Sequence, residues 1–485
     1  MGTTLAELAS VVGARTTGSA AIRDLAYDTR ALTAGSLFFC IPGHRVDGHE
    51  LASDAVARGA TALVVERALD VKVPQMIVES VRAAMGPIAA AFFDHPSRAL
   101  SLVGVTGTNG KTTSVWMLEN VFRQAGMKPG LISNIERHIG DEIVPVDRNT
   151  PESIDLQRLL ARMRDAGVRA AAMEVTSEGI AEGRVEGTHY SCAVFTNLTQ
   201  DHLNYHGTME NYFQAKALLF RSDMAERAVV NVDDTYGCRL VEMLDIPCTT
   251  FAIDAPADVR ARDITSDARG SRFVADAGGE TTDVDVKIPA RHNVANALGV
   301  IATANALGIS LRHAAAGIAA TLGVAGRLEA IDAGQDFTVL VDYAHTPDSL
   351  ENVLRAARDF TPAGARLVVV FGCGGDRDRG KRPLMGRIGV DLADRAIITS
   401  DNPRSEDPRA IISEIETGAR DAGKPYDVEP DRRAAIQMAI ADARTGDVIV
   451  IAGKGHESGQ EFADHTIPFD DRSVARDALG ATARP

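Results

Sequence analysis

Cysteine is scarce in this sequence. The 485 residues include five cysteines, an odd number, and they stand at Cys40, Cys192, Cys238, Cys248 and Cys373. None of them forms a C-x-x-C pair, so the spacing does not indicate a zinc site, and such scattered positions do not indicate a disulfide framework. We therefore expect a protein of the reducing cytoplasm.

The sequence also has fewer basic than acidic residues and few long apolar runs. The formal net charge is -15, which argues against non-specific binding to nucleic acid, because such binding depends on clustered Lys and Arg. The first residues, Met1–Glu7, lack the basic and apolar regions of a secretory signal. A long uncharged stretch, Asn293–Leu311, contains several asparagines, so we expect a buried helix there and no membrane span.

Short β-branched segments alternate along the chain with alanine-rich stretches of helical length. The segments are Ala62–Glu66, Leu102–Val105, Ala228–Asn231, Leu367–Phe371 and Val448–Ala452. This alternation predicts an α/β fold with largely parallel sheets, and ligands are then expected at the turns that follow the strands. The chain is too long for one core, so we expect three domains.

Two segments rich in turn residues predict the domain boundaries. Asp94–Arg98 is polar and contains proline, and Gly323–Arg327 contains two glycines. They predict an N-terminal domain of residues 1–98, a central domain of residues 99–328 and a C-terminal domain of residues 329–485. Within the central domain, the polar segment Asp258–Asp285 predicts a small antiparallel excursion.

A glycine-rich loop stands between a predicted strand and a predicted helix. In such a loop, backbone N–H groups converge on phosphate oxygens, while Lys111 supplies positive charge and Thr112 can reach Mg²⁺. Val105 stands where the general pattern has glycine, so the loop is a variant form. The alternative is a simple turn beside an exposed lysine. We expect the phosphates of ATP at Gly107, Thr108, Asn109, Gly110, Lys111, Thr112 and Thr113.

The loop Gly107–Thr112 has the form found in Mur ligases and folylpolyglutamate synthetases. Further segments extend the first resemblance over essentially the whole chain: Met173–Ser177, Thr196–Leu203, Tyr212–Lys216, Arg291–Asn293, Gly326–Arg327, Asp342–Pro347 and Gly453–Glu457. The chain thus resembles the Mur ligase family. The resemblance implies an N-terminal domain that binds a UDP-substrate, a central P-loop-type ATPase domain with a parallel sheet, and a Rossmann-like C-terminal domain that binds an amino acid.

Within the family, the chain resembles the enzymes that add meso-diaminopimelate as the third residue of the peptidoglycan stem peptide. Asp401–Arg404 resembles their specificity motif, and the planar guanidinium of Arg404 can bind a carboxylate at two points. Taken alone, this segment is merely a turn after a strand. The residues implied in binding diaminopimelate are Arg377, Asp401, Asn402, Pro403, Arg404, Gly453 and Glu457.

The resemblance also implies the chemistry. ATP would phosphorylate the D-glutamate γ-carboxylate of UDP-N-acetylmuramoyl-L-alanyl-D-glutamate, and the amine would then attack the acyl phosphate. Mg²⁺ is implied beside ATP, because cations must neutralise the anions that meet. The implied catalytic residues are Lys111, Glu174, His202 and Lys216. The implied metal site comprises Thr112, Glu174, His202 and Lys216 as a CO₂-derived carbamate, although Lys216 alone would pass for an ordinary helical lysine.

The remaining contacts follow from the same resemblance. Asn293 is expected beside adenine, and Arg327 and Asp342 are expected to approach the nucleotide from the central and C-terminal domains. For Arg327, an interdomain salt bridge is the alternative. The residues implied in binding the UDP-substrate are Thr29, Asn149, Thr150, Thr176, Glu182 and Arg184.

Three residues depart from the family pattern. Asn149 stands where threonine is usual, Glu178 replaces a histidine, and Glu182 replaces a frequent glutamine. Carboxylates facing an anionic substrate would weaken its binding, so a related ligase acting on another carboxylate is a second hypothesis for the function.

A folylpolyglutamate-type ligase is a third hypothesis, but such an enzyme should lack the UDP-binding domain and Asp401–Arg404. A nucleotide-gated binding module is the hypothesis from outside the enzymes. A monomer is the default expectation.

Overall fold

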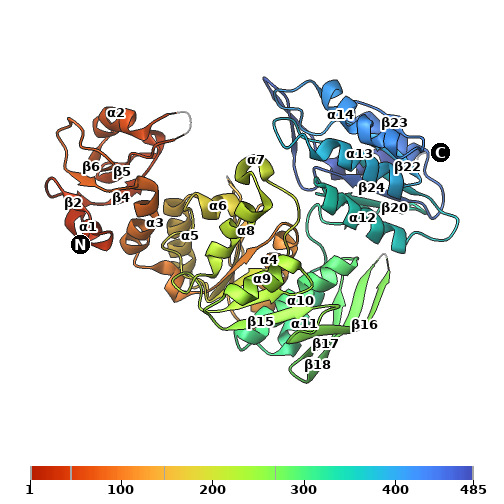
Figure 1. The fold of residues 1–485 in the computed structure, drawn as a ribbon, viewed down its shortest axis with the longest axis horizontal. Helices are drawn as coiled ribbons and strands as arrows, with labels where there is room; N and C mark the ends of the chain where they lie inside the picture. Colours follow the sequence, from red (N-terminus) through yellow and green to blue (C-terminus); the bar gives the residue numbers. More distant parts are fainter. Residues whose placement is uncertain (1–2, 44–45, 147, 268, 483–485) are drawn as a thin grey trace.

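The computed structural model describes residues 3–43, 46–146, 148–267 and 269–482 and arranges them in three α/β bodies (Figure 1). Figure 1 shows the N-terminal body in red and orange at one end, the C-terminal body in blue at the other, and the central body between them. Each body is built around a sheet of its own. Among the described residues, we find no helix with the length and apolar character needed to cross a membrane.

The N-terminal body has a sheet of strand order β2-β7-β6-β5-β4, parallel except where β2 meets β7. Its elements are β1 Thr3–Thr4, α1 Leu5–Val11, β2 Arg15–Thr16, β3 Ala21–Ile22, β4 Asp24–Ala26, β5 Ser36–Phe39, α2 Ala52–Ala57, β6 Ala60–Val65, β7 Gln75–Ile77 and α3 Val81–Phe92. Helices α1 and α3 pack on one face and α2 packs on the other, which explains why β5 and β6 are apolar on both sides.

The central body has the largest sheet, of strand order β11-β10-β9-β12-β8-β13-β14-β15-β16-β17-β18. Its strands are β8 Ser101–Thr106, β9 Pro129–Ile132, β10 Arg137–Ile139, β11 Glu142–Val144, β12 Ala170–Glu174, β13 Cys192–Phe195, β14 Ala228–Asn231, β15 Cys248–Ala252, β16 Val259–Asp267, β17 Gly270–Ala277 and β18 Glu280–Val286. The strands from β9 to β16 in this order run parallel, and the strands beyond them at both ends are antiparallel.

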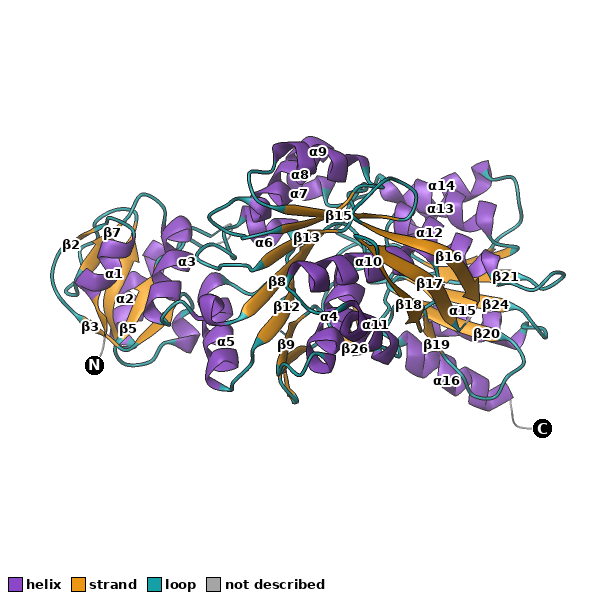
Figure 2. Cartoon of the chain, turned by 90° about the horizontal axis from the view of Figure 1, so that it is seen from below, coloured by secondary structure: helices purple, strands orange, loops and turns teal. Residues whose placement is uncertain are grey.

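Helices lie on both faces of the central sheet (Figure 2). They are α4 Lys111–Gln124, α5 Ser153–Asp165, α6 Ser177–Ala181, α7 Leu203–His206, α8 Met209–Ala217, α9 Thr235–Met243, α10 Arg291–Ala306 and α11 Leu311–Ala320. Apolar side chains of α4, α10 and α11 form one core with the sheet, and those of α5 and α8 form another on the opposite face. Burial on both faces accounts for the nearly continuous apolar runs of the parallel strands.

The C-terminal body has a sheet of strand order β19-β20-β24-β21-β22-β23, parallel except where β19 meets β20. Its elements are β19 Glu329–Ala330, β20 Thr338–Asp342, α12 Pro347–Asp359, β21 Leu367–Phe371, α13 Lys381–Leu392, β22 Arg395–Ile398, α14 Pro408–Asp421, β23 Asp427–Val428, α15 Arg432–Ala441, β24 Val448–Ala452, β25 Gly459–Glu461, β26 Thr466–Pro468 and α16 Asp471–Thr482. Helices α12, α13 and α14 cover one face, and α15 and α16 cover the other.

This architecture confirms the predicted α/β fold with parallel-rich sheets. The predicted apolar segments form strands β6, β8, β14, β21 and β24, and the polar segment 258–285 contains the antiparallel excursion of β16, β17 and β18. The uncharged stretch after Asn293 lies mostly in the buried helix α10. The boundaries near residues 98 and 328 remain predictions, and they fall between the three sheets.

Candidate active site

The glycine-rich loop lies between β8 and α4, as the sequence predicts. Gly107 has a φ of +148°, and a Cβ there would lie 1.9 Å from Oγ1 of Thr196. Gly110 has a φ of +86° and approaches Oδ1 of Asn296 in the same way, at 2.2 Å from a Cβ. Both positions therefore require glycine. The Nζ of Lys111 donates to the carbonyls of Gly107 and Thr108, each at 2.8 Å, so its charge lies across the loop.

A cavity of about 590 Å³ opens beside this loop, between the central and C-terminal bodies. Its wall brings together predicted residues that are far apart in the sequence: Thr108, Asn109, Gly110, Lys111, Thr112, Thr113, Asn149, Thr150, Glu174, Thr176, Arg184, His202, Asn293, Arg327 and Asp342. Most of the predicted nucleotide, metal and acceptor residues thus face one space, and Gly107, Lys216, Thr29 and Glu182 are not in its wall. A cavity of this volume accommodates a nucleotide-sized ligand.

The oxygen donors at one corner of the cavity suit a hard cation. Oγ1 of Thr112 lies 3.0 Å from Oε2 of Glu174 and 3.3 Å from Oδ1 of Asn134. The backbone N–H of Asn134 donates to Oε1 of Glu174 at 3.0 Å, which fixes the carboxylate. The described residues contain no group of three or more His, Cys, Asp or Glu side chains that could hold a metal. The hydroxyl, carboxylate and amide oxygens of Thr112, Glu174 and Asn134 are hard donors, the ligand type that Mg²⁺ takes together with water and phosphate.

His202 lines the cavity and lies beside two carboxylates. Its Nδ1 is 3.3 Å from Oε1 of Glu178 and its Nε2 is 3.3 Å from Oδ2 of Asp201. The hydrogen bond from His202 lowers the pKa of Glu178 in spite of partial burial, and the charge of Arg377 acts in the same direction. Glu178 is therefore a charged carboxylate beside His202.

Lys216 is buried behind the phosphate loop, with 1% of its surface exposed. Its Nζ donates to the carbonyl of Gly107 at 2.9 Å and lies 4.7 Å from the centre of the Tyr212 ring. Burial, together with the nearby charge of Lys111, lowers the pKa of Lys216 well below its usual value. A neutral amine at this position is a nucleophile, as carbamate formation requires.

The nucleotide side of the cavity is held by α10 and by the connection into the C-terminal body. Nδ2 of Asn293 donates to the carbonyl of Pro289 at 2.7 Å, which fixes its orientation at the start of α10. Arg327 donates through Nη2 to Oγ1 of Thr112 at 3.1 Å and lies over the ring of Tyr343. Within the described part of the chain, the Nε of Arg327 is buried and has no hydrogen-bond partner, so the guanidinium retains capacity for an anion.

Asp342 lines the cavity at the end of β20. Its carboxylate accepts hydrogen bonds from the backbone N–H of Leu328 and that of Ala344, both at 2.7 Å. Leu328 has a left-handed φ of +44°, and Asp342 therefore fixes the turn that follows Arg327. Burial raises the pKa of this carboxyl. Although Asp342 lines the cavity, its geometry serves to orient Arg327.

On the acceptor side, the two threonines and the arginine form a connected group. Oγ1 of Thr150 lies 2.9 Å from Oγ1 of Thr176, and Arg184 donates through Nη1 to the carbonyl of Thr150 at 3.2 Å. Arg184 also donates through Nη2 to Oε2 of Glu182 at 2.6 Å. The same Glu182 oxygen lies 3.8 Å from Nη1 of Arg82, which comes from α3 of the N-terminal body.

Two predicted acceptor residues lie outside the cavity wall. Glu182 is held by the two arginines instead of facing the cavity. Thr29 lies in the short 3₁₀ turn Thr29–Ala31 of the N-terminal body and is not among the residues that line the cavity. Asn149, Thr150, Thr176 and Arg184 line the cavity, whereas Thr29 and Glu182 do not.

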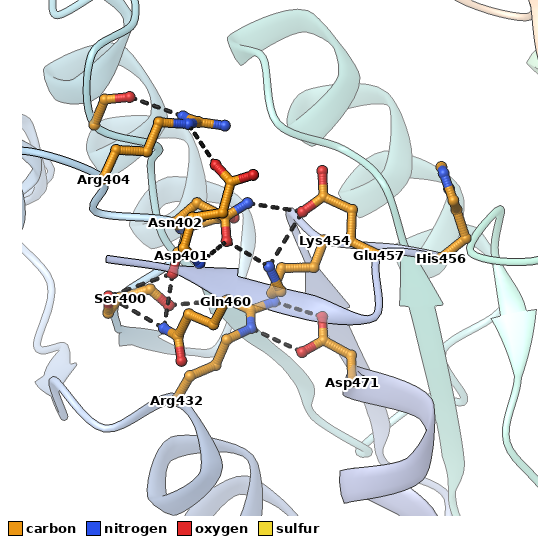
Figure 3. A network of polar contacts seen from close by, with 12 residues as sticks. Ser400, Asp401, Asn402, Arg404, Arg432, Lys454, His456, Glu457, Gln460 and Asp471 are labelled. Atoms are coloured by element: carbon orange, nitrogen blue, oxygen red, sulfur yellow. Dashed lines mark hydrogen bonds and ion pairs between the residues drawn. The ribbon is translucent and has the colours of Figure 1, made fainter. Parts of the chain in front are cut away.

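Four of the predicted amine-donor residues form a second group in the loops after β22 and β24 (Figure 3): Asp401, Asn402, Arg404 and Glu457. Nδ2 of Asn402 donates to Oε2 of Glu457 at 2.8 Å, which joins the two loops. Lys454, whose side chain has 0% exposure, donates to Oδ1 of Asn402 at 2.8 Å and to Oε2 of Glu457 at 3.1 Å. Arg404 donates to Oε2 of Glu461 and to the carbonyl of Gly375, each at 2.8 Å.

The sequence did not single out several residues that complete these sites. Asp348 accepts hydrogen bonds from Nδ2 of Asn109 at 2.8 Å and from Oγ1 of Thr199 at 3.2 Å, linking the phosphate loop to α12. Asp348 directly follows the segment Asp342–Pro347, and this position next to a family motif could have indicated its role. Lys454 likewise lies within a segment that was noted, but its burial depends on the fold.

Comparisons with known proteins agree with this geometry. Three family profiles match the chain: "Mur ligase family, catalytic domain" over residues 21–93, "Mur ligase middle domain" over residues 105–304, and "Mur ligase, glutamate ligase domain" over residues 326–455. The fold and the cavity define an ATP-dependent ligase. The profile matches and the relatives described next show that the chain belongs to the Mur ligase family.

Two curated relatives illustrate the similarity. UDP-N-acetylmuramoyl-L-alanyl-D-glutamate--2,6-diaminopimelate ligase of Geobacillus thermodenitrificans is 48% identical over 95% of this chain and 96% of its own length. The protein of the same name from Listeria innocua is 44% identical over 94% of both chains. The predicted family is therefore confirmed.

Solved structures give the same result for the fold. The structure titled "Structure of UDP-N-acetylmuramoyl-L-alanyl-D-glutamate--2, 6-diaminopimelate ligase" matches with a TM-score of 0.69 and 30% identity, covering 96% of each chain. The MurF ligase of Thermotoga maritima in complex with ADP matches with a TM-score of 0.65 and 17% identity over 95% of this chain and 96% of its own. The second likeness concerns the fold alone.

Proposed function

We propose that the chain joins meso-diaminopimelate to the D-glutamate γ-carboxylate of UDP-N-acetylmuramoyl-L-alanyl-D-glutamate, at the expense of ATP, in peptidoglycan biosynthesis. The observation that carries the proposal is the junction of Asn402 with Glu457, which places a carboxylate and the Arg404 segment at one site. Diaminopimelate has an amino-acid centre at its far end, and it needs a guanidinium for the carboxylate and an anion for the ammonium. The relatives named above support the same donor.

The first step is transfer of the γ-phosphate to the acceptor carboxylate. The carboxylate oxygen forms a bond to phosphorus, the bond to the β-phosphate oxygen breaks, and ADP leaves. Lys111 and Arg327 supply positive charge next to the phosphate loop, and Arg184 supplies it near the acceptor threonines. Bound Mg²⁺, held at Thr112 and Glu174, would neutralise phosphate charge and position the phosphates.

The second step is attack of the donor amine on the acyl phosphate. The C–N bond forms, phosphate leaves, and the amine gives up a proton to the surroundings. Attack requires that water be excluded, because water would hydrolyse the acyl phosphate. The link from Asn109 to Asp348 holds the C-terminal body against the phosphate loop and closes that side of the site.

We further propose that Lys216 acts as a carbamate, with Glu174 and His202 beside the nucleotide, and that the chain works as a cytoplasmic monomer. The burial and lowered pKa of Lys216 support the first proposal. The second hypothesis, a different acceptor carboxylate, rests on unfavourable charge at Glu178 and Glu182. Against it, Glu182 is paired with Arg184, and Glu178 lies beside His202.

One experiment separates a ligase from a nucleotide-gated binding module. ADP release is measured with the acceptor alone, with diaminopimelate alone and with both together. A ligase releases ADP steadily only when both partners are present, whereas a binding module releases none in any of the three mixtures. Steady release with a different acceptor carboxylate would favour the second hypothesis.

A further inference from the structure

The two loops of the proposed amine-donor site follow strands that are not neighbours. Asp401–Arg404 follows β22 and Gly453–Glu457 follows β24, and β21 lies between these strands in the sheet. Sheet hydrogen bonds alone therefore do not fix one loop relative to the other. Asn402 joins the loops directly through its bonds with Glu457 and Lys454, and a recognition site built on both loops also needs support where they leave the strands, across the distance between β22 and β24.

Arg432, the first residue of α15, spans it. Its Nη2 donates to the carbonyl of Ala452 at 3.0 Å, at the end of β24, and its Nη1 donates to the carbonyl of Ser400 at 3.4 Å, just after β22. The guanidinium also binds Asp471 at the start of α16, with Nε 2.8 Å from Oδ1 and Nη2 2.6 Å from Oδ2. Both side chains of this pair are 0% exposed, and the network is shown in Figure 3.

The loops Asp401–Arg404 and Gly453–Glu457 are tightly packed against each other next to the Arg432 guanidinium. Gly453 has a φ of +123°, and a Cβ there would lie 2.4 Å from Oδ2 of Asp401. Burial raises the pKa of Asp401, but the charges of Arg432 and Lys454 outweigh it and hold that pKa below its usual value. A displacement of the Ser400 carbonyl or of the Ala452 carbonyl would therefore be transmitted to the opposite loop.

We propose that Arg432, neutralised by Asp471, is a positioning residue that sets the two amine-donor loops at the separation required for the far end of the donor. The part that concerns the donor rests on the proposed function. A planar guanidinium suits this task, because it reaches two carbonyls and a carboxylate in one plane, which an ammonium does not. Stability alone does not explain a fully buried ion pair, since well-packed apolar residues often serve as well.

The test compares R432K with a matched control in the full-length enzyme. Arg366 forms a similar pair with Asp447, 2.7 Å between Nη2 and Oδ2, at the opposite ends of β21 and β24. R366K therefore perturbs the same sheet away from the donor loops. D471N serves as a second variant, because it keeps Arg432 and removes only the charge that holds it.

Hydrogen exchange gives a readout that does not depend on turnover. We expect R432K and D471N to raise exchange in peptides covering residues 400–404 and 453–461, with no such change in R366K. In kinetics, we expect the KM for meso-diaminopimelate to rise by about tenfold or more, with the KM for ATP within about twofold and kcat less affected than KM. Discrimination against L-lysine should fall as well.

The outcomes distinguish this inference from the proposed function. Unchanged exchange in both loops overturns the positioning role, whatever the activity. Faster exchange with a wild-type enzyme that does not use diaminopimelate sustains the positioning role and overturns the proposed donor. If R432K and D471N both fail to fold while R366K folds, the pair serves the stability of the domain and the inference is overturned.

Discussion

Gly107 and Thr196 are in closer contact than any other residue type at position 107 would allow. A Cβ on Gly107 would lie 1.9 Å from Oγ1 of Thr196, and that hydroxyl already donates to the carbonyl of Asn109 at 2.6 Å. The end of β13 thus fixes the phosphate loop that follows β8. The loop conformation depends on this approach across two neighbouring strands.

Gly107→Ala should strongly weaken productive ATP binding. The added methyl group must displace Thr196 or the loop, and a displacement of about 1 Å is expected to lower kcat/KM for ATP by about 10²-fold. The control is Gly126→Ala, at a φ of +75° with open space around a Cβ. It should cost roughly 1–2 kcal/mol in stability from backbone strain and leave ATP kinetics unchanged. Equal ATP kinetics in the two variants would contradict this account of the loop.

Arg404→Lys should weaken the use of diaminopimelate and spare ATP. Lysine keeps the charge but loses the planar fork, and one lost hydrogen bond to a charged group corresponds to about 1.5–3 kcal/mol, or a tenfold to hundredfold fall in kcat/KM. The measurement is steady-state kinetics with meso-diaminopimelate varied. Arg409→Lys, at an exposed position nearby, serves as the control and should behave like the wild type. A normal kcat/KM in Arg404→Lys would remove Arg404 from the donor site.

The activity of the wild type should depend on CO₂ through Lys216. The neutral amine adds to CO₂, forming an N–C bond and releasing a proton, so that the product carries a negative charge at the position of the lysine nitrogen. Lys216→Met should lower kcat by about 10³-fold, whereas Lys128→Met, at an exposed lysine, should have no effect. Labelled bicarbonate should give a carbamate carbon signal in the wild type that is missing in Lys216→Met. A carbamate signal of equal strength in both proteins would contradict the assignment.

His138 should make stability depend on pH. Burial lowers the pKa of His138, but hydrogen bonds to Glu119 and Glu136, both 2.8 Å long, outweigh burial and raise it above its usual value. The folded state then holds the proton more tightly than the unfolded state. The stabilisation is therefore complete below pH 6.5 and is lost as pH rises through the folded pKa.

The measurement is thermal unfolding of the wild type and His138→Gln between pH 5.5 and 8.5. The wild type should exceed the variant most at the acidic end, and the difference should shrink as pH rises. A difference that stays constant over this range, or grows with pH, would show that the two glutamates do not hold the proton on His138.

Much of the site follows from the sequence because its residues stand at strand ends. In parallel sheets these ends meet at one edge. The local pattern placed Gly107–Thr112, whereas Asp401–Arg404 was placed by the family resemblance, because alone it is only a turn after a strand. Packing between distant segments could not be read in this way. Arg432 and Asp471 are 39 residues apart, and their pairing depends on how α15 and α16 pack.

The orientation of Glu182 shows the same limit. Two added carboxylates near an anionic acceptor look unfavourable from the sequence. In the folded chain, Arg82 reaches Glu182 from another body, across 100 residues of sequence, and Arg184 pairs with the same carboxylate. Its charge is therefore compensated by a contact between domains, which no local pattern encodes.

The central claim is that the enzyme joins diaminopimelate to the D-glutamate γ-carboxylate. The most direct measurement is the mass of the product formed from UDP-N-acetylmuramoyl-L-alanyl-D-glutamate, ATP and Mg²⁺ with equal amounts of meso-diaminopimelate and L-lysine. We predict a product that carries diaminopimelate almost exclusively, with one phosphate released per amide formed. A product carrying lysine, or no product although ATP is bound, would contradict the claim.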